Sequence, residues 1–386
     1  MKQIYHLHFA FLIASTLTLT FGQAQNPTNT PRHDFLSKNG SEGVTSAPFG
    51  TCDQGPVTIY TLSNKNGLQI RAMDFGATIV SVVTPDKNGK FEDISLGFDN
   101  PQTYAKARLT FGSVGRVINR IAGGHFTLDG IPHDLDRNVP PNTLHGGKLG
   151  FARQLWRGEI LSTNPPSVRF TRESPDGEQG FPGTLKSTAT FTLSDDNRLI
   201  VHYEAVTDKP TVVSLATHTL FNLSGAGNGT ILRDIVQINA DCYTPTDATG
   251  IPTGEIRSVD STPLDFRKPM QIGARIGQLT NKPQGYDLNY VLRKSSGEDF
   301  AAEIYDPVSG RNLRVKTDQP GMQFYTGNLF DGTLIGKGGV IYTPYCAFSC
   351  ETQHFPDSPN HPEFPSVVLR PGETYSTTSE YSFSVR

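Results

Sequence analysis

Glu351 is the side chain whose setting most strongly suggests chemistry. It follows a mainly apolar run at 345–348 and stands in the segment Cys350-Glu351-Thr352-Gln353. A carboxylate in apolar surroundings is costly to ionise unless it is paired or hydrogen-bonded. A carboxyl group of this kind is a candidate general base.

Four further segments place polar side chains among small or flexible residues between expected strands. They hold Arg116, Asn119 and Arg120 (115–124), His145 (142–147), His218 (216–225) and Asp287 (285–290). Each of these residues has an ordinary explanation when it is taken alone. A lone histidine is most often a satisfied core or surface residue, a lone arginine forms a salt bridge, and an aspartate beside a glycine makes a turn. No single segment therefore establishes a site.

Signatures of several other chemistries are missing. The sequence has no Gly-x-x-x-x-Gly-Lys-Ser/Thr phosphate loop, no Gly-x-Ser-x-Gly elbow and no His-Glu-x-x-His helix. The segment 146–150, Gly-Gly-Lys-Leu-Gly, lacks the strand-to-helix context of a phosphate cradle. The chain has 34 Lys plus Arg against 37 Asp plus Glu, a net charge of −3, which excludes a generally basic nucleic-acid binder.

The four cysteines are Cys52, Cys242, Cys346 and Cys350, which allow three pairings. In a continuous strand Cys346 and Cys350 would lie about 13 Å apart, beyond the reach of a disulfide. Their spacing without nearby Cys or His partners is also a poor zinc signal, so we predict no metal site. We expect buried free thiols.

The elements that must position these side chains are mostly strands. The chain holds 38 Gly and 27 Pro without any repeat, a density of turn formers that argues against a helical bundle. Only 102–107 and 271–279 favour short helices. We therefore predict an all-β fold, one large antiparallel β-sandwich over residues 51–386. Strand-like alternation occurs at 57–62, 69–73, 78–83, 167–172, 187–193, 198–206, 211–215, 231–238, 301–305, 313–317, 322–326 and 375–385.

The N-terminal region differs from the rest of the chain. Residues 1–24 match a secretory signal peptide, with Lys2, an apolar stretch at 9–21, and Gly22 and Ala24 as small residues before the cleavage point. The alternative is a membrane anchor, but the stretch is shorter than the roughly 20 residues that a spanning helix needs. Residues 25–50 are polar and predict a flexible leader. We expect an exported protein, periplasmic or extracellular, with no membrane association after cleavage.

Taken together and in order, these segments resemble the aldose 1-epimerases, also called galactose mutarotases. The resemblance runs from about residue 57 to 386, nearly the whole of the chain after the leader. The motifs that carry it are Phe75-Gly76-Ala77, Leu96-Gly97-Phe98-Asp99, Gly115-Arg116-Val117, Asn119-Arg120-Ile121, Phe126-Thr127-Leu128-Asp129-Gly130, Leu144-His145-Gly146-Gly147, Ser174-Pro175-Asp176-Gly177-Glu178, the segment 218–225, Tyr286-Asp287, Glu351-Thr352-Gln353 and Leu369-Arg370-Pro371-Gly372-Glu373.

The resemblance implies a β-sandwich with an open sugar cleft, few short helices and no cofactor. It implies interconversion of the α and β anomers of aldohexoses such as glucose and galactose, a step that feeds hexose metabolism. Glu351 is then the general base and His218 the general acid. Arg120, His145 and Asp287 line the substrate site, with Asn119 as a further contact. We expect a monomer or weak dimer.

The implied reaction needs a base and an acid on opposite sides of one hemiacetal. A Glu351 carboxylate and a protonated His218 satisfy this at neutral pH. One departure from the family pattern is Thr219-Leu220, where an aromatic residue is common. Two alternatives remain: a non-catalytic sugar-binding sandwich, which would not need an acid–base pair, and a sugar-phosphate epimerase, which would need an extra basic cluster.

Overall fold

The computed structural model describes Met1 and residues 42–293 and 300–386, and residues 42 onward belong to one compact unit. Its largest element is a nine-stranded antiparallel sheet. The strands in order are β11 (Arg157–Thr163), β12 (Pro166–Ser174), β13 (Leu185–Leu193), β14 (Arg198–Thr207), β29 (Tyr375–Val385), β23 (Arg311–Thr317), β22 (Ala302–Tyr305), β17 (Ile235–Ile238) and β20 (Met270–Gln271).

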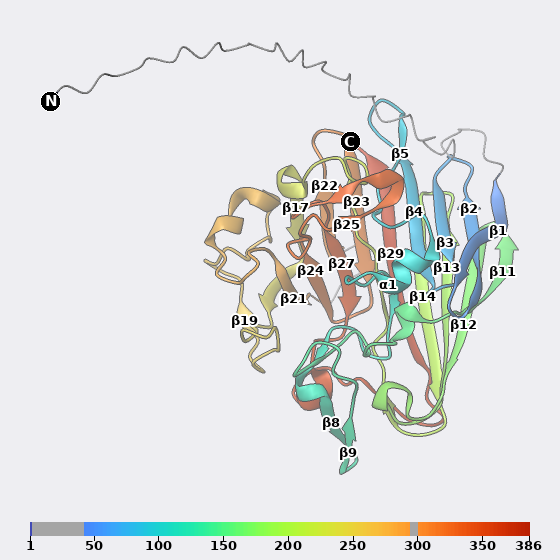
Figure 1. Ribbon diagram of the computed structural model, residues 1–386, viewed down its shortest axis with the longest axis vertical. Coiled ribbons are helices and arrows are strands. Elements are labelled where there is room, and N and C mark those ends of the chain that lie inside the picture. The colour runs from blue at the N-terminus through green and yellow to red at the C-terminus, as the bar shows by residue number, and fades with distance from the viewer. Residues whose placement is uncertain (2–41, 294–299) are drawn as a thin grey trace. The chain divides into compact units, whose positions relative to one another are not determined.

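Two five-stranded antiparallel sheets accompany it. The first runs in sequence order and the second brings together strands from distant parts of the chain (Figure 1). The first consists of β1 (Gly43–Cys52), β2 (Gly55–Ser63), β3 (Gln69–Met73), β4 (Thr78–Pro85) and β5 (Phe91–Asp93). The second has the order β19 (Arg257–Ser258), β18 (Ala240–Tyr243), β21 (Asp287–Leu292), β24 (Gly321–Tyr325) and β27 (Ser349–Gln353).

One hydrophobic core joins all three sheets, which makes the fold a sandwich. Figure 1 shows β2–β4 beside β12–β14, and the rings of Tyr60 on β2 and Phe170 on β12 meet edge to face at 5.5 Å. The second five-stranded sheet faces the same large sheet, since Thr352 on β27 hydrogen-bonds Ser379 on β29 over 2.7 Å. Alternation of buried and exposed residues, as in β13, places one face of each strand in this core.

The predicted all-β sandwich with few short helices is confirmed. Among the residues described, the one α-helix is α1 (Pro101–Lys106), close to the expected window 102–107. Asn100 caps it by accepting a hydrogen bond from the backbone N–H of Thr103. The window 271–279 forms two 3₁₀ turns instead of a helix, at Ile272–Ala274 and Ile276–Gln278. Two glycines in that window lower its helical preference.

Most predicted strands lie within observed strands, and two are shorter than expected. The stretch 211–215 forms a strand only over β15 (Thr211–Val212), which pairs with β28 (Val368–Leu369), and Ser214 adds one isolated bridge to Val117. The stretch 231–238 begins with a 3₁₀ turn at Ile231–Arg233, and only β17 is extended. Both stretches are apolar because they are buried, and burial alone does not decide between a strand and a loop.

The flexible leader predicted for 25–50 is wrong at its C-terminal end. Residues 43–50 belong to β1, which pairs with β2 from Gly43↔Ser63 to Cys52↔Gly55. Backbone pairing to a neighbouring strand holds this mostly exposed segment in place; its apolar Val44 and Phe49 are only partly buried, and they do not form the regular alternation that sequence patterns detect. The signal at 1–24 and the leader up to residue 41 lie outside the residues described.

The four cysteines are free, as expected. Cys346 and Cys350 are buried, whereas Cys52 and Cys242 are only partly buried, unlike the buried thiols that we predicted. Across the part of the chain that the structure covers, no helix is long and apolar enough to cross a membrane.

Candidate active site

Three neighbouring strands of the second five-stranded sheet supply one wall of the site. On β21 Asp287 pairs with Tyr325 of β24, and on β24 Gln323 pairs with Glu351 of β27. Residues two apart on a strand point to the same face, and so do cross-strand partners. Four polar side chains from distant parts of the sequence therefore emerge on one face of this sheet: Asp287, Gln323, Tyr325 and Glu351.

Two short ribbons supply the opposite wall. His218 ends β16 (Ala216–His218), which pairs with β6 (Gly112–Val114). Arg120 begins β7 (Arg120–Ile121), which pairs with β10 (Thr143–Leu144), so that Arg120 lies opposite Leu144. Asn119 and His145 flank this second ribbon, and both have left-handed backbones, with φ of 65° and 53°. Such conformations are uncommon for residues other than glycine and often occur at functional sites.

The central feature is a contact between the predicted acid and the predicted base. Nε2 of His218 lies 3.4 Å from Oε1 of Glu351, and the two side chains are 9% and 3% exposed. Nδ1 of His218 and Oε2 of Glu351 are also buried and have no hydrogen-bond partner within the protein. Buried polar atoms without partners are rare in proteins. Unpartnered atoms on both members of the pair indicate a place for polar groups of a ligand.

Burial moves the pKa values of this pair in opposite directions. It lowers the pKa of His218 to about 4, although the histidine's own backbone and the Asp287 charge favour protonation. Burial raises the pKa of Glu351 well above its usual range; the Asp287 charge raises it further, and the Arg120 guanidinium opposes this. At neutral pH the sequence predicts a Glu351 carboxylate facing a His218 imidazolium. The buried pair instead favours a protonated Glu351 and a neutral His218. The shared proton belongs on Glu351.

His145 stands beside this pair as a hydrogen-bond donor. Its ring meets that of His218 edge to face, with centroids 5.3 Å apart. Its Nδ1 accepts a hydrogen bond of 3.2 Å from the backbone N–H of Asn119. Burial, followed by the charges of His218 and Arg120, lowers the pKa of His145 well below its usual range. The ring is therefore neutral, and its proton is on Nε2.

The same proton argues against a metal in this cluster. Ligand atoms of His145, His218 and Glu351 lie within 4.8 Å of one another, a spacing that could hold an ion. A histidine nitrogen binds metal through a lone pair, and in His145 the nitrogen not occupied by Asn119 carries a proton. The three residues fit an acid–base site better than a metal centre.

Arg120 and Asp287 complete the polar side of the cavity. Nη1 of Arg120 donates to Oδ1 of Asn119 over 3.3 Å, and Nη2 lies 3.9 Å from Oδ2 of Asp287. Nε2 of Gln323 donates to Oδ1 of Asp287 over 2.7 Å. The guanidinium can therefore donate to a ligand, and the carboxylate, held by Gln323, can accept from one.

A cavity with about 530 Å³ of space contains all six predicted site residues: Asn119, Arg120, His145, His218, Asp287 and Glu351. The sequence analysis did not select Gln323, Tyr325 or Leu329, which also line it. The strand predicted at 322–326 contains two of them, but nothing in its alternation distinguishes a cavity-lining glutamine from a core one. Leu220, noted as a departure from the family pattern, lies on the cavity wall and is buried.

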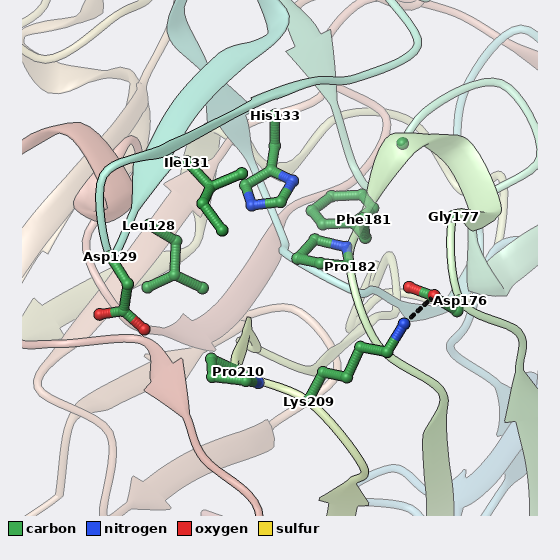
Figure 2. Close-up of a pocket in the computed structure, with 11 residues that line it drawn as sticks. Leu128, Asp129, Ile131, His133, Asp176, Gly177, Phe181, Pro182, Lys209 and Pro210 are labelled. Carbon is green, nitrogen blue, oxygen red and sulfur yellow. Dashed lines mark hydrogen bonds and ion pairs between the residues drawn. The ribbon is translucent and has the colours of Figure 1, made fainter.

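A separate cavity of about 820 Å³ shares no residue with the first. Figure 2 shows the residues that line it. Its walls are largely apolar, as Figure 2 shows for Leu128, Ile131 and Pro210. Its carboxylates already have partners within the protein, since Asp176 pairs with Lys209 at 2.5 Å and Asp129 pairs with Arg370 at 2.8 Å. It therefore lacks an acid–base pair available for chemistry.

Comparisons with known proteins agree with this geometry. The aldose 1-epimerase family model matches residues 58–382. Galactose mutarotase of Rattus norvegicus is 43% identical over 344 residues, which are 89% of this chain and 99% of the rat protein. Aldose 1-epimerase of Escherichia coli K12 is 38% identical over 337 residues, 86% of this chain and 96% of the bacterial protein. The crystal structure of an aldose epimerase homologue from C. elegans superimposes with a TM-score of 0.79 at 32% identity, and covers 88% of this chain and 99% of its own.

The fold and the acid–base pair, with these relatives, define an isomerase that acts on sugars. The chain belongs to the aldose 1-epimerase family, as its motifs suggested.

Proposed function

We propose that this protein interconverts the α and β anomers of aldohexoses, glucose and galactose among them, through the free aldehyde. The observation that carries the proposal is the contact of 3.4 Å between His218 Nε2 and Glu351 Oε1 within the cavity. One group can then face the C1 hydroxyl and the other the ring oxygen of a single sugar. A protein that only binds sugar has no need for a buried base and a buried acid that touch.

In the ring-opening step Glu351, as carboxylate, takes the proton of the C1 hydroxyl, and protonated His218 gives its proton to the ring oxygen O5. The C1–O5 bond breaks with its electron pair moving to O5, and a C=O double bond forms at C1. Rotation about C1–C2 presents the other face of the aldehyde. The ring closes when the two protons return.

The proton placement that burial prefers fits the middle of this cycle. After ring opening Glu351 carries a proton and His218 is neutral, the state that the two pKa shifts favour. The ionised state needed at the start arises when sugar hydroxyls hydrogen-bond Glu351 and the Arg120 charge favours its carboxylate. The pocket is in this respect complementary to the opened sugar.

The surrounding groups orient the sugar. His145, through Nε2–H, and Arg120 donate hydrogen bonds to sugar oxygens and stabilise charge that develops on them. Asp287, held by Gln323, accepts from a ring hydroxyl, with Asn119 as a further contact.

Polarimetry on freshly dissolved α-glucose and α-galactose tests the proposal, with the spontaneous rate subtracted. Glu351→Gln keeps the shape of the side chain but removes the base, and we expect a loss of roughly 10²–10⁴-fold in rate. The variant should still bind a 1-deoxy sugar, which has no anomeric hydroxyl. Equal rates for the wild type and Glu351→Gln would instead support a sugar-binding protein without activity.

We also propose export, with residues 1–24 removed as a signal peptide and function in the periplasm or outside the cell. Lys2, the apolar stretch 9–21 and the small residues Gly22 and Ala24 support it. The rat relative is matched over 99% of its length by 89% of this chain, so this chain carries residues beyond that match. Sequencing the N-terminus of protein from the periplasm or medium tests export, and protein that retains Met1 within the cells contradicts it.

We propose that a single copy suffices for activity, as a monomer or weak dimer. One copy of the chain supplies both members of the acid–base pair and the groups proposed to bind the sugar. A specific activity that is constant on dilution, with the mass measured by light scattering, is the expected result. Activity that disappears as a dimer dissociates would contradict it.

A further inference from the structure

The loop between β18 and β19 packs directly against the guanidinium of Arg120. The contact is made at Gly250, which has a φ of +81°. A Cβ atom at this position would lie 2.8 Å from Nε and 2.9 Å from Cζ of Arg120, closer than real Cβ contacts allow. Any residue larger than glycine would therefore displace the guanidinium from its present position.

The loop itself is held firmly, so that it would not yield in place of the arginine. Oδ1 of Asp247 accepts hydrogen bonds from the backbone N–H of Thr249 at 2.7 Å and of Ile251 at 3.0 Å. The backbone N–H of Gly250 donates to the carbonyl of Asp247 over 3.1 Å, and that of Asp247 donates to the carbonyl of Ile251 over 2.8 Å. This Asx-type turn encloses Gly250 on both sides.

The same loop is attached to the segment that leads to His145. Nδ2 of Asn142 donates to Oγ1 of Thr249 over 3.2 Å, and Oδ1 of Asn142 accepts from the N–H of Gly123 over 2.9 Å. Asn142 immediately precedes β10, and Gly123 follows β7. The loop is thus connected to both strands of the ribbon that carries Arg120 and His145.

Arg120 depends on this backing because few other contacts hold its guanidinium. Its side-chain partners are Asn119, at 3.3 Å, and Asp287, at 3.9 Å. Arg120 and Asp287 also line a third cavity, distinct from that in Figure 2. It has about 1610 Å³ of space and lies on the side of the loop 244–250. A displaced guanidinium therefore has room to move, and a substitution at Gly250 need not disrupt the fold.

We propose that Gly250 is a positioning residue that aims Arg120 at the sugar. This inference rests on the proposed role of Arg120 as a sugar ligand. Gly250 does not act on the substrate; it acts through the guanidinium. Its left-handed backbone and missing Cβ allow a rigid loop to touch the arginine without displacing it.

The test compares Gly250→Ala with Gly130→Ala in the full chain. Gly130 has a nearly identical φ of +80°, and a Cβ there would have no neighbour within 4 Å. Both variants bear the same strain of an alanine in a left-handed backbone. Only Gly250→Ala displaces Arg120.

Binding of 1-deoxygalactose and 1-deoxyglucose, measured by calorimetry, separates positioning from general damage. We expect Gly250→Ala to raise the Kd of the better ligand roughly ten-fold, because one charge-assisted hydrogen bond is lost. Gly130→Ala should leave Kd within two-fold of the wild type, while both variants lose similar thermal stability. Unchanged binding by Gly250→Ala, or equal weakening by both variants, would overturn the inference.

A double-mutant cycle with Arg120→Met completes the test. If Gly250 acts through the guanidinium, adding Gly250→Ala to Arg120→Met has no further effect on Kd. Additive effects would overturn the role of Gly250 and leave that of Arg120 intact. Binding by Arg120→Met that equals the wild type would overturn the proposed role of Arg120, and the role of Gly250 with it.

Discussion

The backbone N–H of Asn119 donates a hydrogen bond to the ring Nδ1 of His145. The backbone N–H of His145 donates in return to the carbonyl of Asn119 over 2.9 Å. Both residues have left-handed backbones. This reciprocal pair holds the imidazole of His145 in one tautomer, with the proton on Nε2, and the ring lies 5.3 Å from that of His218, centroid to centroid. The strained backbone thus has an identifiable effect on the site.

We predict that His145 stays neutral, with its proton on Nε2, through the pH range in which an ordinary histidine titrates. Burial holds its pKa well below its usual range, so protonation begins only at lower pH. ¹⁵N NMR of histidine-labelled protein distinguishes the two ring nitrogens. An Nδ1–H tautomer, or a titration with a midpoint near 6.5, would contradict the assignment.

Glu351→Gln should stabilise the protein while it removes the activity. The raised pKa of Glu351 means that the folded state holds this proton to higher pH than the unfolded chain does. The contribution of the group to the free energy of unfolding is therefore complete below about pH 4.3 and declines as pH rises through the folded pKa. We expect the variant to gain about 1 kcal/mol over the wild type at pH 8 and little at pH 4.

Thermal unfolding at the two pH values measures this difference. Glu303→Gln is a suitable control. Burial acts to raise the pKa of that carboxyl, but hydrogen bonds from Arg386 and Asn312 and the charges of Arg314 and Arg386 outweigh it, so the net shift is downward and the sign of the effect is opposite. A Glu351→Gln variant that is less stable than the wild type at pH 8 would show that the carboxylate is structural.

His218→Gln tests the acid and carries the opposite pH signature. Because burial lowers the pKa of His218 to about 4, the unfolded chain takes up this proton near pH 6.5 and the folded protein only near pH 4. The wild type should therefore lose stability as pH falls from 6.5 to 4, and the variant should lose less. Its kcat should fall by roughly 10²–10⁴-fold. A kcat within three-fold of the wild type would exclude His218 as the acid.

Gln323→Leu should weaken sugar binding more than it slows the reaction. Gln323 donates to Asp287 over 2.7 Å and accepts from Gln353 over 3.4 Å, so its loss frees the carboxylate to turn toward Arg120. We expect KM to rise roughly ten-fold, since about 1–3 kcal/mol of hydrogen bonding is lost, with kcat changed less.

Gln237→Leu provides the matched control for this substitution. Gln237 lies on β17 and makes one hydrogen bond of 3.0 Å, to Arg267, away from the catalytic cavity. Steady-state polarimetry on both variants should show an effect for Gln323 alone. A fall in kcat without a change in KM would mean that Gln323 takes part in the chemistry and does not orient Asp287.

The alternation of apolar and polar residues was sufficient to predict the fold class and the strands that have one buried and one exposed face. The strand predicted at 375–385 has the observed bounds of β29, because each of its residues has one clear side toward the core. Pattern was insufficient where backbone pairing to a distant strand decided the structure, as for the polar strand β1 and for the truncated stretches at 211–215 and 231–238. Cross-strand hydrogen bonds leave no periodic signal in a single segment.

Arg116 and Arg120 show the same limit at the site. Both stand in one glycine-rich segment, and their residue type is the same. The guanidinium of Arg116 is buried and bonded to Ser174, Pro175 and Pro182 behind the site, whereas that of Arg120 faces the cavity. The choice of Arg120 as the ligand came from the family resemblance, and the structure explains it.

The collinear motifs indicated the family and, through it, six residues that line the cavity. The protonation and the mutual orientation of these residues depend on the folded structure. Burial of His218 against Glu351 reverses the charges expected from their ordinary pKa values, because a low-dielectric environment disfavours an ion pair that lacks further hydrogen bonds. The roles of Gly250 and Gln323 could not be predicted from the sequence for a similar reason, since each depends on a neighbour from a distant part of the chain.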